Sequence, residues 1–154
     1  MRPLVLLALL LLAPAGAHAL EPREGWAVAH SAKPYPTLLA DLRAAITAAN
    51  MGLVTEAGPT EAAAARGVTI PGNRVLGVFR NDYAVRALAA SEAAMIEAPI
   101  RFYVTERAEG GATLAYKTPS FVFAPYADEG GAELSAVAAE LDAIFAAIAV
   151  QTLE

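Results

Sequence analysis

The sequence predicts a single α+β domain in which helices pack on one main β-sheet, in the order βαβ(α)βαββα. Apolar and polar side chains alternate from Ile100 to Glu106, which is typical of a half-buried strand. Apolar residues recur every three or four positions from Leu38 to Ala49 and from Leu134 to Ile148, which is typical of amphipathic helices. Because the chain contains no cysteine, its core must form without disulfides.

The N-terminal half supplies two strands and two helices. Gly25 and Ser31 bound a short apolar run that predicts the first strand, Trp26 to His30. A loop with two prolines then leads into the helix that contains Leu38, which ends at Asn50 or Gly52. The next segments are a strand at 53–56, a short helix at 59–66 and a turn-rich connection at 67–73.

The next segment predicts a central strand followed by a helix. Residues 74–80 are apolar on both faces, and Phe79 is expected to point into the core. Residues 82–97 predict a helix that Pro99 terminates. Its core-facing side is expected to carry Val85, Leu88, Ala89 and Ile96.

The C-terminal third predicts a hairpin and a final helix. Residues 108–111 connect the strand at 100–106 to a partner strand, Thr113 to Lys117. Residues 118–126, TPSFVFAPY, contain two prolines and three aromatic residues, and predict a packed extended segment.

The first 19 residues predict a secretory signal peptide. Arg2 precedes an apolar run from Leu4 to Leu12, and Ala17-His18-Ala19 gives a small-x-small cleavage pattern. Cleavage after Ala19 would release a single domain, residues 20–154, into the periplasm or the medium. We expect no membrane anchor after cleavage, because no later stretch looks long and apolar enough to span a bilayer.

Composition restricts the partners. Loss of Arg2 leaves 10 basic residues against 16 acidic ones, a net charge of −6. A chain this acidic, with no basic run, argues against nucleic acid as a partner. The absence of cysteine excludes a thiol nucleophile, and a single histidine in residues 20–154, His30, does not predict a metal site. No GxSxG, GxGxxG or GxxxxGK[ST] motif occurs, so we predict no catalytic residue and no cofactor.

The polar cluster Arg80-Asn81-Asp82 has two interpretations. Asn81 or Asp82 can cap the following helix, and Arg80 can pair with a nearby carboxylate. Alternatively, Arg80 shares a cleft with Arg101 and Tyr116, where two guanidinium groups would bind a small anionic or polar ligand. Separation of Arg80 and Arg101 onto opposite sides of the domain would rule out the shared cleft.

Three segments carry a family resemblance: GVFRNDYAVRAL, EAPIRFYVTE and AYKTPSFVFAPY, at residues 77–88, 97–106 and 115–126. They resemble domain-of-unknown-function family 302, and the resemblance extends from Trp26 to about Ala149. It implies a compact α+β domain that is often a homodimer, and it implies no activity. The positions that match the recurrent pattern of the family are Arg80, Asn81, Asp82, Pro99, Arg101, Tyr116, Pro119 and Ser120.

Three hypotheses for function follow. The first is an exported, non-enzymatic domain that binds a small ligand or a partner, with Arg80, Asn81, Asp82, Arg101, Tyr116 and Ser120 as the binding residues. The second is an accessory protein that assembles an envelope complex through apolar surface. The third is a small hydrolase that uses His30 with Ser91 or Ser120.

Overall fold

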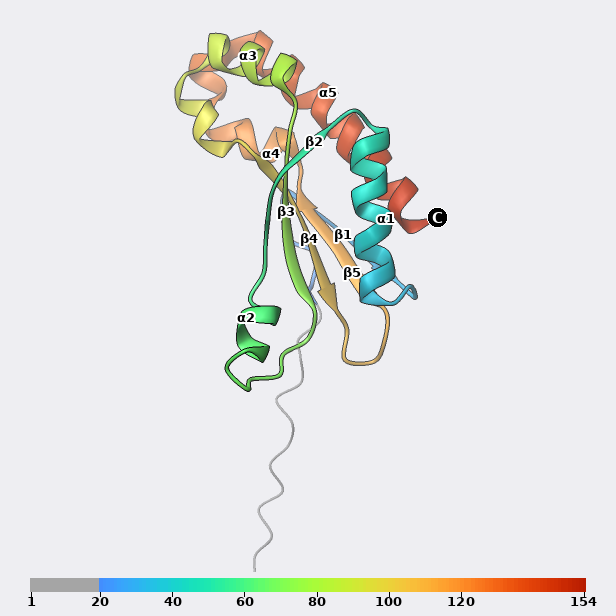
Figure 1. Cartoon of the computed structure of the whole chain (residues 1–154). Coiled ribbons are helices and arrows are strands. Elements are labelled where there is room, and N and C mark those ends of the chain that lie inside the picture. The colour runs from blue at the N-terminus through green and yellow to red at the C-terminus, as the bar shows by residue number, and fades with distance from the viewer. Residues whose placement is uncertain (1–19) are drawn as a thin grey trace, which may run out of the picture.

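The computed structural model describes residues 20–154, so the predicted signal peptide lies outside the described residues. Five antiparallel strands form one sheet in the order β1-β5-β4-β3-β2 (Figure 1). The predicted α+β class is confirmed, and each predicted strand forms within one or two residues of its expected ends. The strands are β1 (Trp26–Ser31), β2 (Gly52–Ala57), β3 (Asn73–Phe79), β4 (Ile100–Glu106) and β5 (Ala112–Lys117).

Two long helices cover one face of the sheet. They are α1 (Tyr35–Ala48) and α5 (Ala127–Leu153), which also pack on each other. The helix α3 (Asn81–Ala90) packs on α5 beyond one end of the sheet, and α2 (Thr60–Ala64) lies at the other end (Figure 1). The short elements are η1 (Ala93–Glu97), α4 (Pro119–Phe123) and η2 (Ala124–Tyr126). We call the face under α1 and α5 the helix side, and the other face the open face.

The core lies between the sheet and these helices. Phe102 of β4 is fully buried and stacks on Phe145 of α5, with ring centroids 4.5 Å apart. Tyr116 of β5 meets the edge of the same Phe102 ring at 5.2 Å. The aliphatic residues around them are Leu38, Leu42, Ile46, Leu76, Val104, Leu114, Leu134, Val137 and Ile148.

The last helix is kinked near its start. Gly131 has φ 57° and ψ −146°, a conformation that is essentially restricted to glycine. By length and composition, the helical stretch Pro119–Leu153 could cross a membrane, so the expectation that no such stretch follows the signal peptide is wrong. Abundant alanines in α5 raise its hydropathy, whereas its larger apolar residues, such as Phe145, pack against the sheet.

Two segments fold differently from the predictions. Residues 118–126 are helical, as α4 and η2, because the Thr118 hydroxyl accepts a hydrogen bond from the Phe121 N–H and Pro119 occupies the first helical turn. The predicted helix at 82–97 is interrupted at Ser91, whose backbone is extended. The Ser91 side chain is buried and donates a hydrogen bond to the Glu129 carboxylate, which ties the break to α5.

The orientation of two apolar sets also differs from the predictions. Leu76 and Val78 of β3 are buried, whereas Phe79 is only half-buried. On α3 and η1, the buried residues are the small Ala87 and Ala94. The larger Val85, Leu88 and Ile96, expected in the core, are exposed by 57%, 50% and 80% of their surface. Contact through alanine brings α3 close to its neighbours and leaves these larger side chains outside.

Candidate functional site

The structure places Arg80 on the helix side, directly before α3. Its backbone is extended and forms the N-cap, so α3 begins at Asn81, and neither Asn81 nor Asp82 is the cap residue as predicted. The Arg80 Nε donates to Asp82 Oδ1 at 2.8 Å, and its guanidinium lies 4.2 Å over the Tyr83 ring. The hydrogen bond from Arg80 lowers the pKa of Asp82 below its ordinary value. Arg80 therefore forms the local ion pair that one interpretation expected.

Arg101 lies on the open face. It pairs in register with Gly77. Every second residue of β4, including Phe102 and Val104, is buried on the helix side, so Arg101 takes the other face. Arg80 follows Gly77 by three positions and therefore takes the opposite face from Arg101. The structure does not bring the two arginines into one cleft, and the predicted two-arginine site is corrected accordingly.

Arg101 and Tyr116 instead share a hollow that opens where β4 and β5 separate. The register between these strands ends at Phe102 with Tyr116, so Ile100 and Arg101 continue without a β5 partner. The open-face hollow has a volume of about 490 Å³. It is lined by Trp26, Asn73, Val75, Glu97, Ile100, Arg101, Tyr103, Tyr116, Lys117 and Val122.

The aromatic walls of the open-face hollow are held in place by neighbouring polar groups. The Tyr103 hydroxyl accepts a hydrogen bond from Asn73 Nδ2 at 2.5 Å. Trp26 pairs in register with Lys117, whose Nζ lies 5.9 Å from the centroid of the indole. Tyr116 borders the hollow, but its ring packs on the helix side against Phe102, and burial raises the pKa of its hydroxyl above the ordinary value.

Two cations of the open-face hollow have no carboxylate partner among residues 20–154. Neither Arg101 nor Lys117 takes part in an ion pair there. The one acidic residue of the lining, Glu97, accepts a hydrogen bond from the Tyr126 hydroxyl at 2.8 Å. With two cations and one carboxylate, the lining carries a net charge of +1 on a strongly acidic chain.

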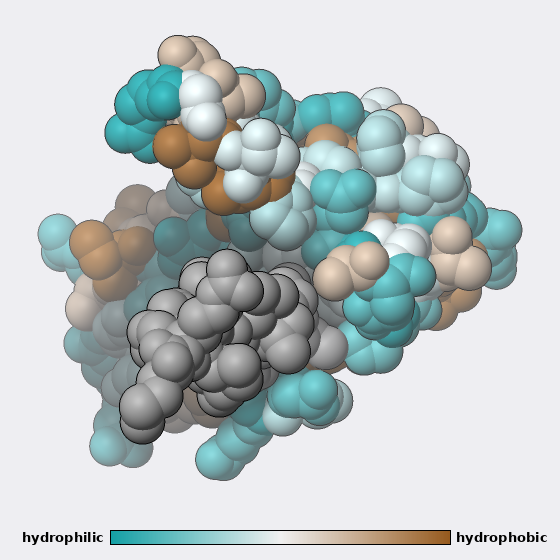
Figure 2. Space-filling model, turned by 90° about the horizontal axis from the view of Figure 1, so that it is seen from below, coloured by the Kyte–Doolittle hydropathy of each residue, from teal (hydrophilic) through white to brown (hydrophobic). Residues whose placement is uncertain are grey.

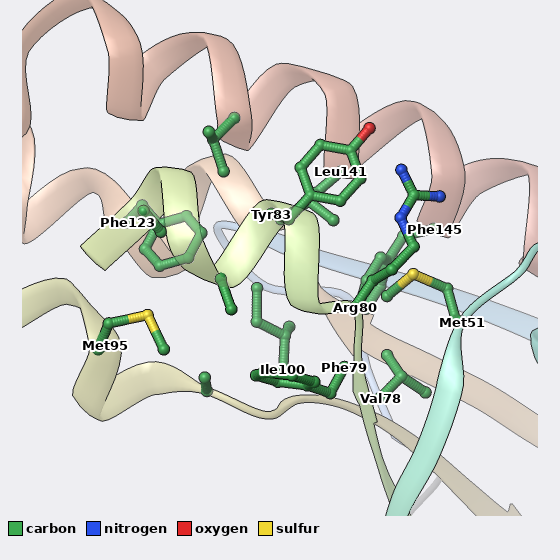
Figure 3. Close-up of a pocket in the computed structure, with 14 residues that line it drawn as sticks. Met51, Val78, Phe79, Arg80, Tyr83, Met95, Ile100, Phe123, Leu141 and Phe145 are labelled. Atoms are coloured by element: carbon green, nitrogen blue, oxygen red, sulfur yellow. The ribbon is translucent and has the colours of Figure 1, made fainter. Parts of the chain in front are cut away.

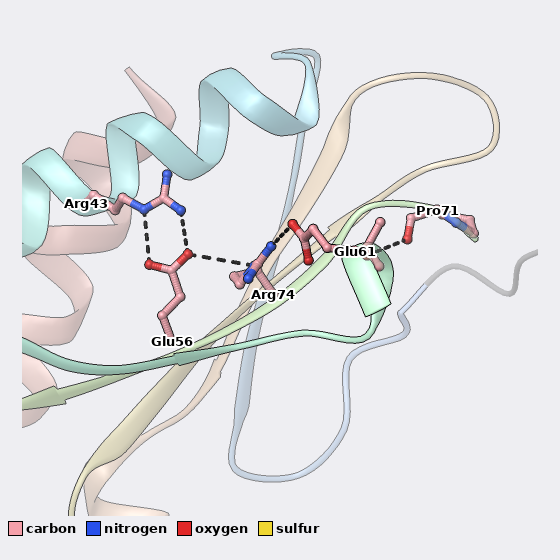
Figure 4. A network of polar contacts seen from close by, with 6 residues as sticks. Arg43, Glu56, Glu61, Pro71 and Arg74 are labelled. Carbon is pink, nitrogen blue, oxygen red and sulfur yellow. Dashed lines mark hydrogen bonds and ion pairs between the residues drawn. The ribbon is translucent and has the colours of Figure 1, made fainter. Parts of the chain in front are cut away.

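Elsewhere in residues 20–154, five arginines pair with carboxylates: Arg43, Arg74, Arg80, Arg86 and Arg107. Arg43 Nε donates to Glu56 Oε2 at 3.2 Å, and Arg74 bridges Glu56 and Glu61 on the helix side (Figure 4). The hydrogen bond from Arg43 lowers the pKa of Glu56. This network joins α1, β2, β3 and α2, and we interpret it as a structural tie.

Seen from below, the surface is mostly hydrophilic, with hydrophobic residues in separate small groups (Figure 2).

The remaining polar candidates have structural partners. The Ser120 backbone N–H donates to Asp142 Oδ1 at 2.9 Å, at the start of α4. His30 Nδ1 lies 3.0 Å from the Thr113 hydroxyl, so the partner of this histidine is a threonine and not Ser91 or Ser120. Within residues 20–154, no group of three His, Asp or Glu side chains is arranged to hold a metal ion.

Comparison with known proteins decides the family. The family model described as "Domain of unknown function DUF302" matches residues 27–148. The chain belongs to the DUF302 family. The crystal structure of an uncharacterized conserved DUF302 protein from Bacillus stearothermophilus superimposes with a TM-score of 0.72. It shares 15% sequence identity, and the match covers 84% of this chain and 98% of the other, which shows a common fold. No curated protein matches the sequence.

Membership of the DUF302 family confirms the resemblance seen in the sequence.

The open-face hollow contains residues that were not predicted from the sequence. Trp26, Glu97 and Lys117 were not predicted as site residues. Trp26 and Lys117 each begin or end a strand, and only the register between β1 and β5 shows that they are adjacent. Glu97 enters from η1, which the sequence had joined to the preceding helix.

Proposed function

We propose that the protein is a non-enzymatic binding domain that holds a small anion with a planar apolar part in the open-face hollow. The observation that supports this most strongly is the pair Arg101 and Lys117, which have no acidic partner among the described residues and share the hollow with Trp26 and Tyr103. Guanidinium and ammonium groups bind carboxylate or phosphate oxygens, and aromatic walls hold a planar group.

The size of the hollow fits this class of ligand. Small-molecule sites usually have volumes of ~300–1,000 Å³ and combine an apolar lining with a few polar groups. The open-face hollow, at about 490 Å³, falls within that range. Its cationic donors come from Arg101 and Lys117, which suits an acceptor-rich ligand.

Trp26 provides a direct test, because it is the single tryptophan of the chain. Trp26 fluorescence is followed during titration with benzoate and, separately, with inorganic phosphate. Benzoate should give a saturable change in fluorescence. The double variant Arg101→Met, Lys117→Met should lose at least about ten-fold in affinity, since a charge-assisted hydrogen bond contributes ~1.5–3 kcal/mol. Arg66→Met is the matched control, because Arg66 is exposed near α2 and does not line the hollow.

Two results would contradict the proposal. One is that neither anion changes the fluorescence or the melting temperature of the wild type. The other is that the double variant binds benzoate as well as the wild type does.

We further propose that the domain acts after export, with the signal peptide cleaved between Ala19 and Leu20. This rests on the n-region, the short apolar run and the Ala17-His18-Ala19 pattern. Mass spectrometry of the protein from a periplasmic fraction should give a chain that begins at Leu20. An intact Met1 would exclude cleavage.

The alternative of an assembly protein, including a homodimer, is favoured by one observation. Val85, Leu88 and Ile96 are large apolar residues that lie exposed on α3 and η1. An apolar surface of this kind is suited to a protein partner. Sedimentation analysis of Leu88→Lys against the wild type tests it: a monomeric wild type would exclude the homodimer.

A further inference from the structure

We propose a second binding site, on the helix side, for the alkyl end of a short-chain aliphatic carboxylate. The site is a cavity of about 40 Å³ between α3, α5 and the end of the sheet (Figure 3). We call it the helix-side cavity. It shares only Ile100 with the lining of the open-face hollow, and it does not depend on the function proposed for that hollow.

The wall of the helix-side cavity is almost entirely apolar. Met51, Ala87, Met95, Phe123 and Phe145 contribute to it, and Arg80 and Tyr83 are the only residues of the lining with ionisable side chains. A water molecule inside a protein needs two to four polar partners, and an apolar cavity without them stays dry and accepts apolar guests. The helix-side cavity is therefore suited to hydrocarbon.

Its volume sets the length of that hydrocarbon. A single water needs roughly 10–15 Å³ on the same measure, so about 40 Å³ holds roughly three groups of water size. A chain of three or four carbons fills this space. Met51 and Met95 are unbranched and flexible, so they can shift to admit one or two carbons more.

Arg80 identifies the head group. Its guanidinium stacks on Tyr83 and belongs to the lining of the cavity. Among the described residues it pairs with a single carboxylate, that of Asp82, through Nε. The Nη groups carry four of the five N–H donors of an arginine, and a carboxylate binds such donors in a bidentate manner. A ligand whose chain enters the cavity would leave its carboxylate at Arg80. Butyrate and hexanoate have both parts at the right length.

Methionine methyl NMR tests this directly. The chain has three methionines, Met1, Met51 and Met95, and the last two line the helix-side cavity. Hexanoate should shift both of these ¹³C-methyl signals with saturation, butyrate should bind more weakly, and acetate should leave them unchanged. The proposal is overturned if hexanoate shifts neither signal, or if acetate acts like hexanoate.

Variants separate the chain from the charge. Arg80→Met should weaken hexanoate by at least about ten-fold and leave the neutral 1-hexanol unaffected. Asp82→Asn should tighten hexanoate about two- to five-fold, because it removes a competing exposed negative charge. Equal hexanoate affinity in wild type and Arg80→Met would refute the role of the cation.

Filling the cavity provides the last control. Ala87→Leu should abolish the hexanoate shifts. Because Ala87 is buried and this variant can fail to fold, Ala84→Leu offers the same test at a half-buried position of the lining. Arg66→Met should leave hexanoate binding unchanged, since Arg66 is exposed near α2 and lines neither the helix-side cavity nor the open-face hollow. Retention of wild-type affinity in a folded Ala84→Leu would show that the ligand binds elsewhere.

Discussion

Replacement of Phe145 by alanine tests whether the aromatic cluster between α5 and the sheet holds the fold together. Phe145 is fully buried, stacks on Phe102 with centroids 4.5 Å apart, and lies 5.5 Å from the Tyr116 ring. Truncation of a buried phenylalanine costs ~3–5 kcal/mol, which combines lost transfer free energy with an unfilled cavity. The loss of two aromatic neighbours places Phe145→Ala in the upper part of that range.

This loss is large compared with the stability of a domain. A free energy of unfolding of ~5–15 kcal/mol is usual, so the variant should lose a third of it or more. For about 135 residues, 1 kcal/mol corresponds to roughly 3–5 °C, so the melting temperature should fall by about 10–20 °C. Calorimetry and urea denaturation of the same samples measure both quantities.

Phe121→Ala is the matched control for Phe145→Ala. The residue type and the change are identical, but Phe121 is 39% exposed on α4. We expect it to lose less than half as much free energy as Phe145→Ala. If the two variants lose equal stability, or if Phe145→Ala lowers the melting temperature by less than about 5 °C, the aromatic cluster is not the main contact between α5 and the sheet.

Two further predictions concern α5. Gly131→Ala should destabilise by ~1–3 kcal/mol in urea denaturation through backbone strain, because the added methyl group meets no atom within 4 Å apart from the neighbouring backbone of its own helix. A gain in stability would show a regular helix, where alanine is favoured over glycine. Arg86 pairs with Glu133 and Glu140, and its hydrogen bond lowers the pKa of Glu140. A carboxyl group whose pKa is lowered by folding stabilises the fold at pH values above its unfolded pKa of ~4.3. This stabilisation is lost as the pH falls through the folded pKa. The stability difference between wild type and Arg86→Gln should therefore shrink below about pH 4, and a difference independent of pH would contradict the ion pair.

The strands and long helices could be predicted because their patterns are local. The alternation from Ile100 to Glu106 belongs to one strand, and the apolar stripe from Leu134 to Ile148 belongs to one helix. Neither pattern depends on a distant residue, so the sequence was sufficient. The prediction of an extended segment at 118–126 was wrong, because a proline at the start of a helix and a proline in an extended segment look alike in the sequence. The Thr118 cap, which the structure shows, distinguishes them.

The candidate site depended on facts that are not local. The sequence showed that Arg80 and Arg101 were polar residues near strand ends, but the face of each depends on where the alternation of β3 and β4 begins. A shift of one position reverses that face, as Phe79 and Val78 also show. For the same reason Trp26 and Lys117, which are adjacent across β1 and β5, could not be recognised as neighbours.

The strand order has a consequence for how the chain reaches its fold. The first strand, β1, has no neighbour in the sheet except β5, and their pairs join residues 81 to 91 positions apart, from Ser31 with Ala112 to Trp26 with Lys117. Pairing between residues so far apart in the sequence is slow, since the ends of a long loop must meet before any hydrogen bond offsets the lost entropy. During synthesis, β1 must remain unpaired until nearly three-quarters of the chain has been made. Strand β1, the first strand to be made, therefore cannot join the sheet before the last strand, β5, has been made.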